Sequence, residues 1–172
     1  NILPHFSQIF DFANEIIKLP NYLSTGIYMW RNIFLYFQEF DLASTDDEDD
    51  DSNLILELLF MLLEIIPLSL ASENEEDRLQ ALQLVEILHI FLVDIETLNK
   101  HQFILIESLF QSLLQEFEVS LNSDNIELSH CCSAIACFIE TPPCFVDESI
   151  LSSFFELTVA ILSDENFSIE KG

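Results

Sequence analysis

The sequence predicts an all-α fold, and three observations support this class. Half of the 172 residues are hydrophobic, which is enough for a sizeable core. The chain contains only 2 glycines and 5 prolines, too few for the turns of a many-stranded β fold. Apolar residues recur at helical spacing in successive stretches, which predicts about seven helices.

The predicted helices follow one another along the whole chain. Pro4 suits a first turn, Pro20-Asn21 ends the first helix, and Pro142-Pro143 separates the last two. Most of the helices are apolar over more than the stripe that a surface helix needs, so we expect them to pack on two sides. In order, they are expected at residues 3–19, 22–40, 54–70, 77–93, 101–121, 126–140 and 148–163.

Residues 54–71 are apolar enough to raise the alternative of a membrane span. Glu57 and Glu64 lie inside this stretch, where each would cost a few kcal/mol at the centre of a bilayer, and Pro67 interrupts it. The flanking residues are acidic, without the Lys or Arg that fixes orientation in a membrane. We therefore expect a helix buried between protein neighbours, and no membrane partner.

A similar connector recurs after three of the aliphatic helices. Its copies are Ser72-Glu73-Asn74, Ser123-Asp124-Asn125 and residues 163–166, and the first residues of successive copies are 51 and 40 positions apart. Ser, Asp and Asn are preferred N-cap residues, so each connector is expected to open the next helix where the chain continues. Spacings of this size bracket the period of HEAT and armadillo arrays. The sequence therefore predicts an α-solenoid of antiparallel helical hairpins, with units at residues 1–41, 54–93, 101–140 and 147–172 and an acidic linker at 42–53.

Residues 54–93 resemble a HEAT repeat, with a leucine-rich first helix, a short acidic turn and a second helix. Asp77, Arg78, Ala81 and Leu82 occupy the places where the family has an Asp, an Arg-containing pair, an Ala and an aliphatic residue. The usual Pro after the turn Asp is absent, and only this unit carries the Arg. The resemblance implies a segment of a larger intracellular scaffold, in the cytoplasm or the nucleus.

The chain is strongly acidic, with 31 acidic and 5 basic residues and a formal net charge of −26. Such a field repels nucleic acid phosphates and anionic lipid, and it attracts basic proteins. We therefore expect no direct nucleic acid binding. The candidate partner-binding residues are Asp46, Asp47, Glu48, Asp49, Asp50 and Asp51, followed by Glu73, Glu75 and Glu76.

Two interpretations of the acidic run 46–51 stay open. It is a solvated linker kept open by self-repulsion, and it can at the same time be an electrostatic contact for a Lys/Arg-rich protein, because the two roles do not exclude each other. The second interpretation is similar to what HEAT proteins of the nuclear-transport receptor (karyopherin-β) class do, because their acidic loops and inner faces hold basic cargo or Ran. Recognition of a basic protein is the expected function. The alternatives are a chaperone for a basic client, such as a ribosomal protein or histone, and a purely architectural segment.

No catalytic motif is present, so neither enzymatic activity nor a cofactor is expected. The chain lacks a P-loop and the usual hydrolase, metalloprotease and dinucleotide-binding signatures, and its two glycines are too few for a phosphate cradle. Glu57 and Glu64 lie seven residues apart on one helical face, which is the usual pattern of the solvent-exposed side of a helix. Four histidines are scattered among the predicted helices, at His5, His89, His101 and His130.

Four cysteines lie within 14 residues, at Cys131, Cys132, Cys137 and Cys144. Their spacing fits neither a disulfide framework nor the paired C-x₂₋₄-C pattern of structural zinc, so no metal site is expected and a reducing compartment is favoured. Small buried thiols packed against a neighbouring helix are the expected role. The aromatic cluster is likewise expected in the core, with a groove for an apolar peptide as the alternative; its members are Tyr28, Trp30, Phe34, Tyr36, Phe37 and Phe40.

Overall fold

The computed structural model describes residues 7–39, 50–93, 95–120, 125–140, 146 and 148–162. Within these ranges the chain forms seven α-helices, one short 3-10 turn (Pro20–Tyr22) and no strand, so the predicted all-α class is confirmed. The helices are α1 (Ser7–Ile17), α2 (Leu23–Glu39), α3 (Asp50–Leu70), α4 (Glu75–Val93), α5 (Lys100–Ser120), α6 (Asn125–Glu140) and α7 (Glu148–Leu162).

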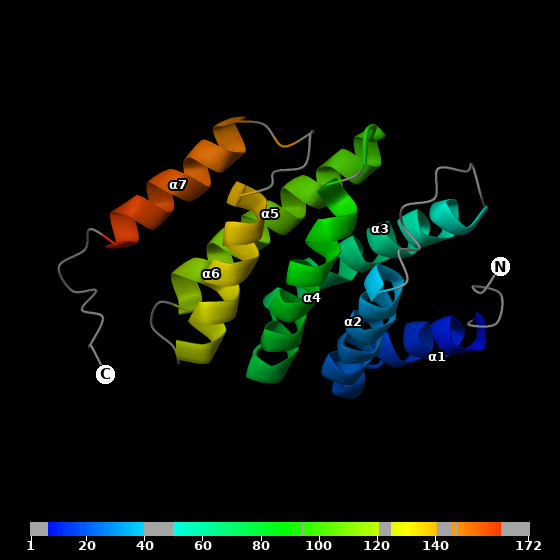
Figure 1. Ribbon diagram of the computed structural model, residues 1–172. Helices are drawn as coiled ribbons and strands as arrows, with labels where there is room; N and C mark the ends of the chain where they lie inside the picture. Colours follow the sequence, from blue (N-terminus) through cyan, green and yellow to red (C-terminus); the bar gives the residue numbers. More distant parts are fainter. Residues whose placement is uncertain are drawn as a thin grey trace.

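The helices pack in pairs and in two layers. α1 contacts α2, α3 contacts α4, and α5 contacts α6, so these six helices pack as three successive hairpins. The second helices of these pairs, α2, α4 and α6, lie side by side in one layer, while α3 packs against α5 in the other (Figure 1). α7 contacts α6, and α1 and α7 lie at opposite ends of the row (Figure 1). This arrangement is compatible with a helical repeat fold.

The helix boundaries agree with the predicted ones to within a few residues, with one notable difference. α3 begins at Asp50 and not at Leu54, so the last four residues of the predicted acidic linker are helical. Acidic residues are favourable in a first turn because the N-terminal end of a helix carries partial positive charge. Residues 1–6, 121–124 and 163–172, which include parts of two predicted connectors, lie outside the described ranges.

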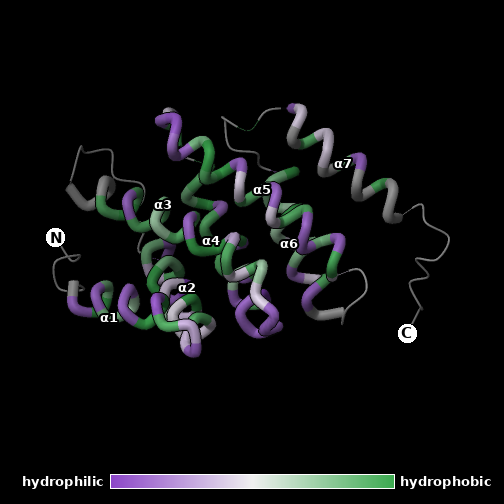
Figure 2. The backbone as a smooth tube through the Cα atoms, turned by 180° about the vertical axis from the view of Figure 1, so that it is seen from behind, coloured by the Kyte–Doolittle hydropathy of each residue, from purple (hydrophilic) through white to green (hydrophobic). Residues whose placement is uncertain are grey.

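One continuous hydrophobic core runs between the two layers. At the contact of α2 with α4, the rings of Phe34 and Phe91 meet edge to face with their centroids 5.1 Å apart. At the contact of α5 with α6, the ring centroids of Phe110 and Phe138 lie 4.7 Å apart. Figure 2 shows hydrophobic residues along these helices, with hydrophilic residues gathered near the starts of α4 and α5.

The crossing of α1 with α2 depends on a glycine. Gly26 is buried, and a Cβ atom built on it would lie 2.6 Å from the Cα atom of Ile17. Only a residue without a side chain lets the two backbones approach this closely. The N-terminal hairpin is therefore fixed by backbone contact as well as by aromatic packing.

None of the described helices combines the length and apolarity that a bilayer span requires. α3, the most aliphatic stretch, instead packs against both α4 and α5. Pro67 lies within its last turn, and the helix continues to Leu70. The predicted position of this helix, between protein neighbours, is confirmed.

The predicted N-cap at the α3–α4 connector is also confirmed. The side-chain oxygen of Asn74 accepts a hydrogen bond of 3.2 Å from the backbone N–H of Glu76, in the first turn of α4. At the start of α5, Asn99 and Gln102 form a reciprocal box in which each side-chain oxygen accepts the other residue's backbone N–H at 3.0 Å. Side chains thus satisfy helix-end amides that have no partner within the helix.

Candidate functional site

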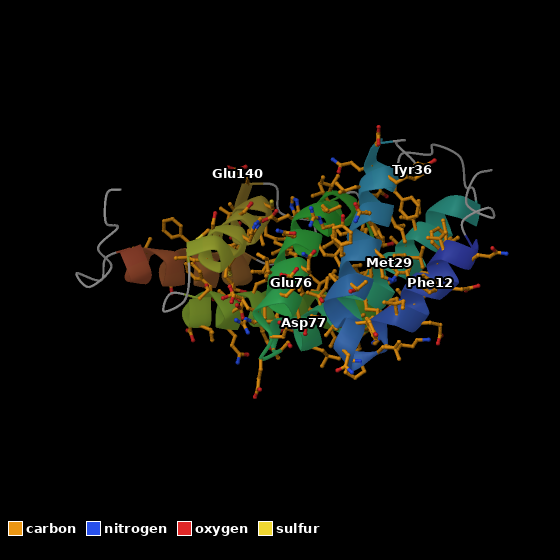
Figure 3. The ribbon with its side chains drawn as sticks, turned by 90° about the horizontal axis from the view of Figure 1, so that it is seen from below. Phe12, Met29, Tyr36, Glu76, Asp77 and Glu140 are labelled. Carbon is orange, nitrogen blue, oxygen red and sulfur yellow. The ribbon has the colours of Figure 1, made fainter. Side chains whose placement is uncertain are left out.

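The predicted acidic residues fall into two groups. Residues 46–49 lie outside the described ranges, and Asp50 and Asp51 form the start of α3. The other group is described fully: Glu73, Glu75 and Glu76 are all exposed at the connector between α3 and α4, and Figure 3 shows Glu76 at the start of α4. The structure therefore places one of the two predicted acidic clusters on a defined surface.

Asp77, next to these acids, is buried and ties two hairpins together. It is only 5% exposed. Its Oδ1 atom accepts a hydrogen bond of 3.1 Å from the backbone N–H of Ser24 in α2, and its Oδ2 atom accepts one of 2.8 Å from the hydroxyl of Ser72. A single carboxylate therefore holds both the connector and the start of a helix in the preceding hairpin.

Arg78 makes the corresponding link to the following hairpin. Its Nε atom donates a hydrogen bond of 2.7 Å to Glu127 in the first turns of α6, and its Nη1 atom donates one of 2.8 Å to the backbone oxygen of Ser72. The carboxylate of Glu116 in α5 lies 3.4 Å from the same Nε atom. Because Glu116 and Glu127 are 3% and 1% exposed, this is a buried ion pair with two acids for one guanidinium.

Because two carboxylates share one guanidinium in this cluster, the pKa values of Glu116 and Arg78 are shifted. Burial, together with the nearby Glu127 carboxylate, raises the pKa of Glu116 from 4.5 to about 7, although Arg78 acts in the opposite direction. The pKa of Arg78 is raised, mainly by its hydrogen bond to Glu127. At neutral pH, Glu116 therefore exchanges between its protonated and ionised forms while Arg78 stays charged.

A chain of polar side chains, here called the polar band, crosses the layer of α2, α4 and α6. The band consists of Glu76, Gln80, Arg31, Gln83, His130 and Glu86. Gln80 donates to Glu76 at 2.8 Å, and Arg31 donates to Gln80 at 3.5 Å and also to Gln83. Gln83 Nε2 lies 3.2 Å from His130 Nε2, and His130 Nδ1 lies 3.1 Å from Glu86.

The polar band fixes the tautomer of its histidine. An amide nitrogen can only donate, so His130 Nε2 accepts from Gln83 and His130 Nδ1 carries the hydrogen that faces Glu86. The cationic side chain of Arg31 is thus hydrogen-bonded to the neutral amides of Gln80 and Gln83. The band ends on the carboxylates of Glu76 and Glu86.

Three basic side chains in the described ranges are already engaged by other residues of the chain. Lys18 lies 2.9 Å from Glu15, Arg31 belongs to the polar band, and Arg78 belongs to the buried cluster. Among the residues that the structure describes, no ion pair reaches Glu73, Glu75 or Glu76. The negative charge of the connector is therefore available to an external partner.

In the described ranges, the cysteine and histidine side chains do not form a common cluster. Cys131 is fully buried, and its thiol lies 3.7 Å from the backbone oxygen of Leu113, which confirms the packing role predicted for it. For Cys132 that interpretation is wrong, because its side chain is exposed. His89 packs edge to face on Phe138 with the ring centroids 4.9 Å apart. Across the described ranges, no group of three or more His, Cys, Asp or Glu side chains lies close enough to hold a metal ion; Cys144 and His5 lie outside them.

The aromatic cluster divides between the core and the surface. Trp30, Phe34 and Phe37 are buried, as predicted, whereas Tyr28 is exposed and Phe40 lies outside the described ranges. An almost wholly apolar pocket of about 370 Å³ lies on the α1–α2 side of the molecule, where Figure 3 shows Met29 and Tyr36. Its lining consists of Ile9, Tyr28, Met29, Asn32, Ile33, Tyr36 and Phe37.

Comparisons with known proteins add no relative. No protein-family model matches the sequence, and no curated protein and no solved structure is similar enough to count as a match. The resemblance of residues 54–93 to a HEAT repeat is therefore carried by this chain's own residues alone.

Sequence reasoning missed the buried cluster and the polar band. Glu116 and Glu127 are separated from Arg78 by 38 and 49 positions, so no local spacing rule connects them. One clue was available: acidic residues inside strongly apolar helices are rarely buried unless paired. In a chain with so few basic residues, each Arg within an apolar stretch was a candidate partner.

Proposed function

We propose that this chain is a protein-binding segment that recognises a lysine- and arginine-rich protein through the acidic side chains at its connectors. The observation that carries the proposal is the exposed trio Glu73, Glu75 and Glu76, which has no basic neighbour in an ion pair among the described residues. The net charge of −26 supports it, because a field of this sign concentrates cationic partners at the surface.

The buried neighbours of the trio favour recognition by a rigid surface. Asp77 and Arg78 follow the acids directly in the sequence and are bonded to the preceding and following hairpins. The connector is thus held from both sides, so little conformational freedom is lost when a partner binds. Acids on such a surface contribute mainly to the association rate and to the selection of partners.

We further infer that the chain is a HEAT-type α-solenoid segment, with the nuclear-transport receptor class as its nearest functional model. The support is that Asp77 and Arg78, two of the residues that resemble the family's pattern, are the ones that link successive hairpins. In this class a basic cargo is bound at acidic surfaces and released when Ran-GTP binds. A chaperone for a basic client would use the same charges but would not respond to Ran-GTP.

The function is tested by binding of the intact chain to a fluorescein-labelled peptide of alternating Lys and Ser, followed by fluorescence anisotropy. Two variants are compared with the wild type: one with Asp46 to Asp51 replaced by Ser and Asn, and one with Glu73, Glu75 and Glu76 replaced by Gln. We expect each to weaken binding at low salt, where surface charges are least screened. Unaltered affinity in both variants would favour a purely architectural segment and overturn the proposal.

A further inference from the structure

The layer formed by α3 and α5 carries an amphipathic groove that the connector acids do not use. The groove has a volume of about 630 Å³. Its apolar lining residues are buried or half-buried, whereas Glu57 and Glu64 of α3 and His101 of α5 are exposed and form its rim. The full lining is Leu56, Glu57, Phe60, Met61, Glu64, Asn99, His101, Gln102 and Leu105.

The two carboxylates on the rim are exposed and only weakly engaged. The Oε1 atom of Glu64 lies 3.3 Å from Nε2 of His101, and both side chains are exposed to solvent. Glu57 forms no ion pair with any residue in the described ranges. Met61, halfway between them on α3, is half-buried, and so is Leu105 across the groove. An occupant therefore meets an apolar strip flanked by negative charge, which complements a basic amphipathic segment.

The spacing of the carboxylates matches a helix better than an extended strand. Glu57 and Glu64 are seven residues apart, which is about 10.5 Å along the axis of α3. Cations seven residues apart on a helix lying alongside would have the same separation. An extended segment would need partners for its backbone groups, but the side-chain oxygens of Asn99 and Gln102 on the rim are already used in the capping box of α5. A helix satisfies its backbone internally.

We propose that the α3–α5 groove docks an amphipathic basic helix of the protein partner. Lys or Arg residues seven positions apart face Glu57 and Glu64, and the apolar residues between them rest on Met61, Phe60 and Leu105. This inference rests on the proposed recognition of a basic protein. It adds a second contact surface to the connector acids, and this surface lies on the layer of α3 and α5.

The test uses the intact chain and a fluorescein-labelled peptide of about 18 residues, long enough for more than two heptads of helix, with Lys at seven-residue spacing and Leu between. A second peptide has the same composition in scrambled order. The variant Glu57→Gln/Glu64→Gln removes two charges and keeps the size of both side chains. The matched control, Glu107→Gln/Glu118→Gln, removes two exposed charges from α5 that do not line the groove.

We expect Glu57→Gln/Glu64→Gln to weaken binding of the heptad peptide about 3- to 10-fold, and the control to weaken it less than about 2-fold. The scrambled peptide should bind the wild type more weakly and should distinguish the two variants little. Circular dichroism should be unchanged in both, because all four side chains are exposed.

Failure of this inference is separable from failure of the proposed function. If the groove variant and the control bind the heptad peptide equally, the groove is not the docking site. If in that case replacement of Glu73, Glu75 and Glu76 by Gln still weakens binding, basic-protein recognition stands at the connector and the groove assignment alone is overturned. If no variant changes affinity, both fall.

Discussion

The backbone N–H of Ser24 donates a hydrogen bond of 3.1 Å to Asp77, 53 residues further along the chain. Ser24 lies in the first turn of α2, where backbone amides have no acceptor within the helix. Asp77 lies in the first turn of α4, in the next hairpin. A side chain of one hairpin therefore completes a helix end of its neighbour, which fixes how α2 and α4 pack.

Replacement of Asp77 by Ala should destabilise the protein by about 1–3 kcal/mol, because Ser24 N–H and the Ser72 hydroxyl lose a buried acceptor. Asn at this position should cost less, since it keeps one acceptor oxygen. Urea unfolding followed by circular dichroism measures both. The control is Glu75→Ala, at an exposed position two residues away, for which we expect a change within about 0.5 kcal/mol. Equal effects at the two positions would contradict the role of Asp77.

The raised pKa of Glu116 predicts a pH dependence of stability. Between its ordinary pKa of 4.5 and its folded pKa of about 7, the folded chain binds more protons at this site than the unfolded chain does. The contribution of protonated Glu116 is therefore fully present below about pH 4.5 and is lost as the pH rises to about 7. Glu116→Gln removes this titration.

Urea unfolding of wild type and Glu116→Gln from pH 4.5 to 8 isolates that contribution from the remaining carboxylates, which both proteins share. The stability of Glu116→Gln relative to wild type should rise by up to about 3 kcal/mol across this range. Parallel pH profiles would show that the Glu116 carboxyl titrates alike in the folded and unfolded chains.

Gly26→Ala should destabilise the α1–α2 hairpin by about 1–3 kcal/mol, because the added methyl would meet the backbone of Ile17 and not a flexible side chain. Hydrogen exchange should show lost protection in α1 first. Thr25→Ala changes an exposed neighbouring residue and serves as the control. If Gly26→Ala is as stable as Thr25→Ala, the two helices can move apart without cost.

The cysteines should differ in reactivity. In a variant that keeps only Cys132, the exposed thiol should react with a maleimide in the native state, whereas in one that keeps only Cys131, reaction should require unfolding. Burial raises the pKa of the Cys131 thiol, and partial desolvation raises the pKa of the Cys132 thiol although its side chain is exposed, so slow native reaction at neutral pH is expected even for Cys132. Comparable native rates would indicate that α6 opens readily from α5.

Much of the fold was predictable because helix formation and helix capping are local. The breaker residues and the apolar spacing located all seven described helices, and Asn74 caps α4 at the connector where an N-cap was expected. The predicted start of α3 lies four residues too late, because a run of acids is typical of a linker but also favours a helix N-terminus.

The contacts between hairpins were not predictable from spacing. Arg78 was identified by its resemblance to a family pattern, but its partners Glu116 and Glu127 come from two other helices. The partners depend on which helices become neighbours and in which register, and neither is encoded in a local stretch. The same holds for the groove between α3 and α5, because the spacing of Glu57 and Glu64 by itself predicts only a solvent-exposed helix face.

The most direct measurement is a salt titration of the affinity of the intact chain for the peptide of alternating Lys and Ser. If the exposed acids recruit a basic partner, the dissociation constant should rise steeply as monovalent salt is increased from about 20 to 200 mM, since the screening length falls through about 10 Å near 0.1 M. An uncharged peptide of alternating Gln and Ser should not bind at any salt concentration. No binding of the lysine peptide at low salt, or an affinity that does not respond to salt, would contradict recognition by surface charge.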